Sequence, residues 1–105
     1  MGDTPEKAAA RELMEETGYQ AEAYVQIGVV NPNPALFNNH CYTYIARNVR
    51  KVCDPAPDQF EDIQVLLIPL SDIPELIRKW EIDHAMVITA FYWYSSQTQQ
   101  GLKLF

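Results

Sequence analysis

Strand-forming residues gather in three segments of the chain, and proline-bearing polar segments separate them. β-branched and aromatic residues, which favour strands, are concentrated in residues 21–30, 40–48 and 63–68. Polar residues interrupt the first two segments. The third is almost wholly apolar, so we expect it to be a strand buried on both faces. Residues 31–39 and 50–59 contain prolines and polar residues typical of loops, and we expect them to connect the strands.

Three further segments are predicted to be helices, at residues 5–17, 71–80 and 84–95. Ser71 is the expected N-cap of the second helix, and Asp83 that of the third. Apolar residues surround more than one face of the third helix, which indicates burial against the sheet or against a partner chain. This order of helices and strands in 105 residues predicts one domain of the α/β (α+β) class.

The first helix has start and stop signals at both ends. Thr4 can cap its N-terminus, and Pro5 suits its first turn. Ala8 to Ala10 propagate a helix well, and Gly18 is the expected left-handed stop. We therefore place this helix at Pro5–Thr17.

Three glutamates in this helix are expected to share one face. Glu12, Glu15 and Glu16 fall within a narrow arc at about 100° per residue, and no Lys or Arg lies among them on that arc. Like charges at these spacings repel, and carboxylate oxygens are the ligands that Mg²⁺ or Mn²⁺ prefers. Arg11, four residues before Glu15, can orient a carboxylate toward such an ion. The alternative interpretation is an acidic helix face exposed to water.

Composition limits the partners of the chain. Its net charge of −6, from 8 basic and 14 acidic residues, argues against binding DNA or RNA, which requires a basic surface. It contains no apolar segment long enough to cross a membrane and no signal sequence. Cys41 and Cys53 form no C-x-x-C motif, so we expect a reduced, cytoplasmic protein.

The segment from Arg11 to Tyr19, Arg-Glu-Leu-Met-Glu-Glu-Thr-Gly-Tyr, resembles the R-E-U-x-E-E-x-G-U end of the Nudix box, where U is a bulky apolar residue. The resemblance implies a Nudix-type α/β/α sandwich, with a mixed sheet flanked by this helix and the C-terminal helices. It implies a hydrolase in which water attacks one phosphorus of a nucleoside diphosphate linked to another group. Glu12, Glu15 and Glu16 would hold Mg²⁺ or Mn²⁺, with Arg11, Glu12 and Glu15 counted as catalytic.

Two later segments, 60–65 and 77–85, resemble the ADP-ribose diphosphatase subgroup of this family, which implies ADP-ribose or a nucleotide sugar as substrate. Relatives of this type often carry the general base as a Glu in the loop before the third strand. The matching position here is Gln59, an amide that cannot accept a proton from water. Asp58 or Glu61 is the expected substitute, and we name Glu61 among the catalytic candidates. An ordinary solvated carboxylate is the alternative interpretation of Glu61.

The loop at residues 31–39 lies where the resemblance implies contacts with the substrate. Asn33 and Asn39 are the expected hydrogen-bonding residues, and Phe37 is expected to stack on a base; Asn38 and Tyr42 are further candidates. Ordinary turn chemistry, which Asn and Pro favour, explains the same residues equally well.

The front of the motif departs from the family pattern. Asp3 stands where the box has a Glu, and the opening Gly of the box would fall before Met1. We therefore expect residues 1–105 to be a truncated Nudix domain whose exposed edge and apolar face are covered in a homodimer or higher homo-oligomer. One alternative is a catalytically inactive domain that acts as an oligomerising or ligand-binding module. Another is a natural chain that begins earlier and contains a complete domain.

Overall fold

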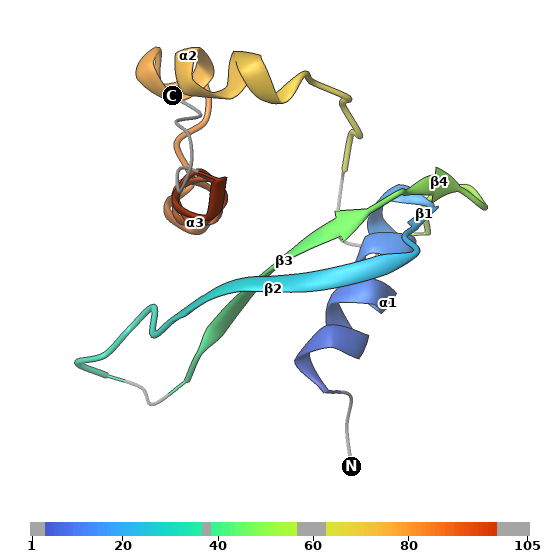
Figure 1. Cartoon of the computed structure of the whole chain (residues 1–105), viewed down its shortest axis with the longest axis horizontal. Helices are drawn as coiled ribbons and strands as arrows, with labels where there is room; N and C mark the ends of the chain where they lie inside the picture. The colour runs from blue at the N-terminus through green and yellow to red at the C-terminus, as the bar shows by residue number, and fades with distance from the viewer. Residues whose placement is uncertain (1–3, 37–38, 57–62, 99–105) are drawn as a thin grey trace. The chain divides into compact units, whose positions relative to one another are not determined.

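The computed structural model describes residues 4–36, 39–56 and 63–98 (Figure 1). Its elements follow in the order α1 (Pro5–Thr17), β1 (Tyr19–Gln20), β2 (Ala23–Val30), β3 (Cys41–Arg47), β4 (Arg50–Lys51), the 3₁₀ turn η1 (Leu70–Asp72), α2 (Ile73–Arg78) and α3 (Ala85–Thr98). The predicted α/β class is confirmed. In the described residues the strands form two separate two-stranded sheets, β1–β4 and β2–β3, whereas the family resemblance implies one mixed sheet.

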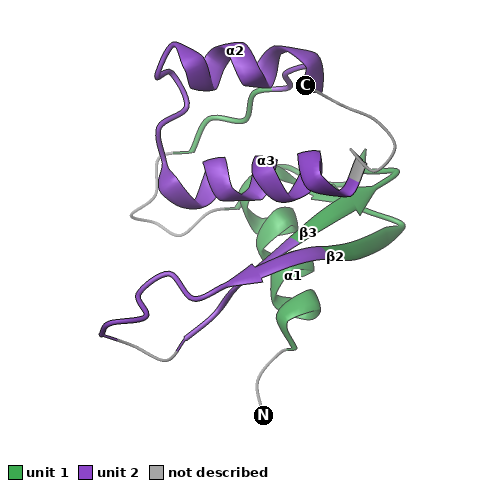
Figure 2. Cartoon of the chain, turned by 60° about the vertical axis from the view of Figure 1, so that its left-hand side comes forward, with its two compact units in different colours: residues 1–26, 44–66 green, residues 27–43, 67–105 purple. Residues whose placement is uncertain are grey.

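The chain divides into two compact units, which Figure 2 shows in different colours. The first comprises residues 1–26 and 44–66, and the second comprises residues 27–43 and 67–105. Residues 23–26 of β2 and 44–47 of β3 belong to the first unit, and residues 27–30 of β2 and 41–43 of β3 belong to the second.

In the first unit, α1 leads directly into a short antiparallel ladder. Tyr19 of β1 pairs with Lys51 of β4, and Gln20 pairs with Arg50. The sequence predicts only a loop at residues 50–59, and this part of the prediction is wrong. A two-residue strand has no periodicity to detect, because it forms only through pairing with a distant segment.

The β2–β3 pair is the longer of the two sheets, and its strands lie close to the predicted segments 21–30 and 40–48. Where β2 begins and β3 ends, the Glu22 amide donates to the Arg47 carbonyl at 3.0 Å. Asn48 adopts a left-handed φ of 54°, which Asn tolerates well. Its side-chain amide donates to the Glu22 carboxylate at 3.1 Å and so links the two strands outside the ladder.

In the second unit, α3 packs against β2 at a glycine. A Cβ built on Gly28 would lie 2.3 Å from the Trp93 indole, so only a residue without a side chain allows this approach. Ile27 is 8% exposed and Ile73 is 6% exposed, which makes them the buried hydrophobic residues of the described chain. The face of α3 that bears Trp93 therefore packs against the sheet, as predicted. The face that bears Tyr92 does not, because Tyr92 is 67% exposed.

Residues 63–68 are not a buried strand, so that prediction is wrong. They have no strand partner among the residues that the structure describes, and Leu66 and Leu67 are 64% and 79% exposed. An apolar run becomes a strand only when a neighbouring ladder accepts its backbone groups.

The caps of the two later helices also differ from the prediction. Ser71 lies within η1, and α2 has no side-chain cap, so the chain enters it through the 3₁₀ turn. His84 caps α3 in place of Asp83, because its Nδ1 accepts from the Met86 amide at 3.1 Å. Among the described residues, no helix is both long enough and apolar enough to span a membrane.

Candidate functional site

Both ends of α1 are fixed by local hydrogen bonds, as the sequence predicts. Thr4 Oγ1 accepts from the Lys7 amide at 3.2 Å, which satisfies one of the free amides of the first turn. At the other end Gly18 has a φ of 80°, and its amide donates to the Met14 carbonyl at 2.8 Å. The hydroxyl of Thr17 also donates to the Leu13 carbonyl at 2.6 Å. The helix that bears the candidate residues is thus defined by its own sequence.

The segment after β4 holds the C-terminal turn of α1 in place. The amides of Val52 and Cys53 donate to the Gly18 carbonyl at 2.9 and 3.3 Å, and the Ala56 amide donates to the Glu15 carbonyl at 2.7 Å. A Cβ on Gly18 would lie 2.0 Å from the Cys53 carbonyl oxygen, so this approach requires glycine. The sequence does not predict this support, because the three residues lie more than thirty residues from the helix end and contribute only backbone atoms. They fix the backbone that carries Glu15 and Glu16.

The candidate carboxylates on α1 differ in their exposure. Glu12 and Glu15 are exposed, and Glu16 is half-buried. Arg11 Nη1 lies 3.7 Å from Glu15 Oε1, with both side chains 51% exposed. An exposed pair of this kind contributes only a few tenths of a kcal/mol, about 0.2–0.5. The pair therefore adds little to the stability of the helix.

The electrostatics of this face favour a cation. Glu12, Glu15 and Glu16 lie in the C-terminal half of α1, where the helix dipole already presents negative charge, and the last turn contains no basic residue. Among the residues that the structure describes, no group of three or more His, Cys, Asp or Glu side chains lies close enough to hold a metal ion. The expected metal site on Glu12, Glu15 and Glu16 therefore stays a prediction.

The predicted substrate residues lie on the second unit or outside the described chain. Asn33 and Asn39 are exposed. Asn31 Oδ1 accepts from the Asn33 amide at 3.0 Å, and the Asn33 carbonyl accepts from the Leu36 amide at 3.0 Å. This is the turn chemistry that the sequence offers as the alternative, and it leaves the Asn33 side chain available. Phe37, Asp58, Gln59 and Glu61 lie outside the described residues.

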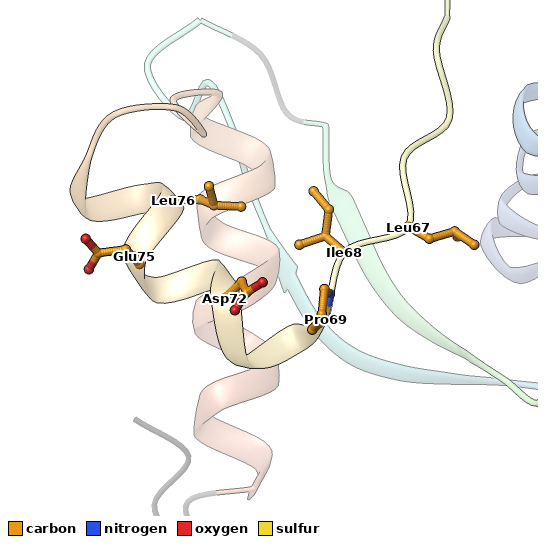
Figure 3. A pocket seen from close by; sticks show the side chains of 6 residues that line it. All are labelled: Leu67, Ile68, Pro69, Asp72, Glu75 and Leu76. Carbon is orange, nitrogen blue, oxygen red and sulfur yellow. The ribbon is translucent and has the colours of Figure 1, made fainter.

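A hollow of about 460 Å³ at the start of α2 is lined by two other carboxylates, those of Asp72 and Glu75 (Figure 3). Its lining is mostly apolar and consists of Leu67, Ile68, Pro69, Asp72, Glu75 and Leu76. Glu75 points away from Ile68 and Leu76 and already contacts Arg78 and Lys79. The Arg78 hydrogen bond, followed by the weaker contact with Lys79, holds the pKa of Glu75 below its ordinary value. One carboxylate of this hollow is therefore already paired with two cations.

Comparisons with known proteins identify the family of the chain. A family model described as NUDIX domain matches residues 1–91. The chain is 37% identical over 81 residues to an ADP-sugar pyrophosphatase of Mus musculus, a match that covers 69% of this chain and 35% of the mouse protein. It is 28% identical over 82 residues to an ADP-ribose pyrophosphatase of Bacillus subtilis (strain 168), covering 77% of this chain and 44% of that protein. The chain thus spans less than half the length of these relatives.

Proposed function

The chain belongs to the Nudix family, and we propose that it carries the metal-binding helix of an enzyme that hydrolyses a nucleoside diphosphate linked to another group. The family match includes all of α1. The two relatives are both named as pyrophosphatases of ADP-linked compounds, which supports this class of substrate for the present chain.

The observation that carries the proposal is the placement of three carboxylates on the C-terminal half of a helix whose end is fixed from outside. Folding alone does not favour this arrangement, because Glu12, Glu15 and Glu16 repel one another and the helix dipole. A divalent cation would turn both unfavourable terms into binding energy. Carboxylate oxygens also fit a hard ion such as Mg²⁺ or Mn²⁺ by their chemistry.

In this proposal each residue of the helix has a distinct role. Glu12, Glu15 and Glu16 hold the ion through carboxylate oxygens, and Arg11 positions Glu15 through the 3.7 Å contact. When bound there, such an ion would neutralise charge at the diphosphate and would lower the pKa of the attacking water. The Gly18 turn and the 52–56 segment hold the backbone of the helix end in place, so only the glutamate side chains need to move to meet the ion.

The reaction consumes one water molecule and breaks one P–O bond of the diphosphate bridge. The oxygen of water bonds to one phosphorus, and the bridging oxygen leaves with the other phosphate. We propose ADP-ribose or a related ADP-sugar as substrate, with AMP and a sugar phosphate as products. Asn33 and Asn39 are the proposed hydrogen-bonding residues and Phe37 the proposed stacking residue. Glu61, with Asp58 as the alternative, is proposed to accept the proton of the attacking water.

A turnover assay on paired variants tests this proposal. AMP release from ADP-ribose is followed by chromatography with Mg²⁺, with Mn²⁺ and with EDTA. The test variant is Glu15→Gln with Glu16→Gln, which keeps the size of both side chains and removes their charge. Glu6→Gln is the matched control, because Glu6 lies on the same helix at about 180° from Glu15.

We expect AMP release that requires the metal ion, falls by at least about a hundredfold in the double variant and is retained in the control. Metal binding without turnover in the wild-type chain would instead support a ligand-binding module. Equal turnover by the double variant and the control would contradict the role of this helix face.

A further inference from the structure

Basic residues are concentrated where β3 gives way to β4. Three of the eight basic residues of the chain, Arg47, Arg50 and Lys51, lie within five positions, and all three are exposed. Asn48, with its left-handed φ of 54°, and Val49 connect the two strands between them. We call residues 47–51 the basic segment. Its charge is opposite to that of the chain as a whole, which is −6.

Backbone pairing places the basic segment beside the end of α1, within the first unit (Figure 1). Arg50 and Lys51 pair with the two residues of β1, which follow directly on the Gly18 turn that ends the helix. The next residue, Val52, donates its amide to the Gly18 carbonyl at 2.9 Å. The segment is therefore anchored next to the last turn of the acidic helix.

The two arginines of the segment form no ion pair within the part of the chain that the structure describes. The Glu22 amide donates to the Arg47 carbonyl at 3.0 Å, but the Glu22 carboxylate accepts from the Asn48 side chain at 3.1 Å. Lys51 differs, because its Nζ lies 3.9 Å from Asp54 Oδ1. The two guanidinium groups are thus available to an anion from outside the chain, whereas the ammonium group is partly balanced.

The charges at the proposed site require cations beyond one divalent ion. The three glutamates of α1 and Arg11 carry a net charge of −2 (three acidic groups and one basic group), which one such ion neutralises. The diphosphate bridge of the substrate brings about −2 more. Hydrolysis increases this charge, because each phosphate monoester formed carries about −1.5 to −2. Positive groups near the end of α1 would balance it.

We propose that Arg47 and Arg50 bind phosphate oxygens of the diphosphate substrate. This inference rests on the hydrolase proposed above and adds a phosphate-binding segment to it. A guanidinium group is always charged near neutral pH and can donate two parallel hydrogen bonds to a phosphate. The two arginines would hold the substrate before the reaction and stabilise the negative charge that develops as the bridge breaks.

Steady-state kinetics with ADP-ribose and Mg²⁺ test this role. Loss of one charge-assisted hydrogen bond weakens binding by at least about tenfold, so Arg47→Gln and Arg50→Gln should each raise KM by at least about tenfold. Because these bonds already form in the ground state, kcat should change less than KM. Arg50→Lys, which keeps the charge but not the two parallel donors, should fall between Arg50→Gln and the wild type.

Lys7→Gln is the matched control. It also removes one positive charge from an exposed residue of the first unit, but Lys7 lies in the first turn of α1, at the opposite end of the helix from the basic segment. Its KM should equal that of the wild-type chain. Circular dichroism confirms that each variant is folded.

A binding experiment without turnover separates this inference from the hydrolase itself. Inorganic diphosphate is titrated into the ¹⁵N-labelled chain in EDTA, so that no ion on α1 can hold the probe. We expect the amide signals of residues 47–52 to shift at millimolar diphosphate. The shifts should vanish when Arg47→Gln and Arg50→Gln are combined, and they should persist in Lys7→Gln.

The two experiments fail in different ways. An active wild-type chain whose KM is unchanged in both arginine variants would overturn the inference, and so would diphosphate shifts that are absent or that centre outside the basic segment. A wild-type chain that binds diphosphate at residues 47–52 but shows no metal-dependent turnover would contradict the hydrolase and still support the phosphate-binding segment.

Discussion

Gly18→Ala tests the close approach that holds the C-terminal end of α1. The substitution adds one methyl group where a Cβ would lie 2.0 Å from the Cys53 carbonyl oxygen. Because that contact is with backbone, the 52–54 segment must move away. The movement would weaken the bonds from the Val52 and Cys53 amides to the Gly18 carbonyl.

The expected loss of stability follows from two contributions. An L-residue held at a φ of 80° costs about 1–2 kcal/mol. Two weakened backbone hydrogen bonds cost about 0.5–1.5 kcal/mol each. The sum is about 2–5 kcal/mol, which is a large part of the roughly 5–15 kcal/mol that stabilises a typical domain.

Urea unfolding followed by tryptophan fluorescence measures this loss. Gly18→Asn separates the two contributions, because Asn tolerates the left-handed conformation but still carries a Cβ. If the contact with Cys53 dominates, Asn and Ala will be about equally destabilising. Ala10→Gly, within α1, gives the scale of an ordinary helix substitution at about 1 kcal/mol. A loss below about 1 kcal/mol for Gly18→Ala would refute the described packing of the 52–56 segment against the helix.

Three further substitutions test contacts elsewhere in the chain. Gly28→Ala should cost about 1–3 kcal/mol in urea unfolding, because its Cβ would meet the Trp93 indole at 2.3 Å; an unchanged midpoint would contradict that packing. His84→Ala removes the cap of α3 and should cost about 1 kcal/mol, whereas His84→Ser, which restores a capping oxygen, should cost less. The Arg78 hydrogen bond lowers the pKa of Glu75, so the pair stabilises the fold above the unfolded-state pKa of Glu and loses this effect as pH falls through the folded-state pKa. In an NMR titration Arg78→Gln should raise the pKa of Glu75, and an unmoved titration curve would count against the pair.

The parts of the fold that depend on neighbouring residues were predictable from the sequence. α1 has the predicted bounds, because Thr4, Pro5 and Gly18 act within a turn of the positions that they specify. β2 and β3 lie within about two residues of their predicted segments, since their β-branched residues are bounded by turn-forming residues.

The parts that depend on distant residues were not predictable. Residues 63–68 have strand-forming side chains, but a strand requires a partner that the described residues do not provide. β4 carries no pattern of its own and exists only because β1 pairs with it. At the candidate site, the sequence identifies the acidic face of α1. The support of its end by the amides of residues 52, 53 and 56 emerges only from the structure.

Paramagnetic relaxation by Mn²⁺ tests the central claim, that the acidic face of α1 binds a divalent cation. Substoichiometric Mn²⁺ broadens the amide signals of residues near the ion in a ¹⁵N-correlated NMR spectrum. The account predicts that broadening centres on residues 12–16, disappears in Glu15→Gln with Glu16→Gln, and persists in Glu6→Gln. Broadening spread evenly over all acidic residues, or no broadening at millimolar Mn²⁺, would contradict it.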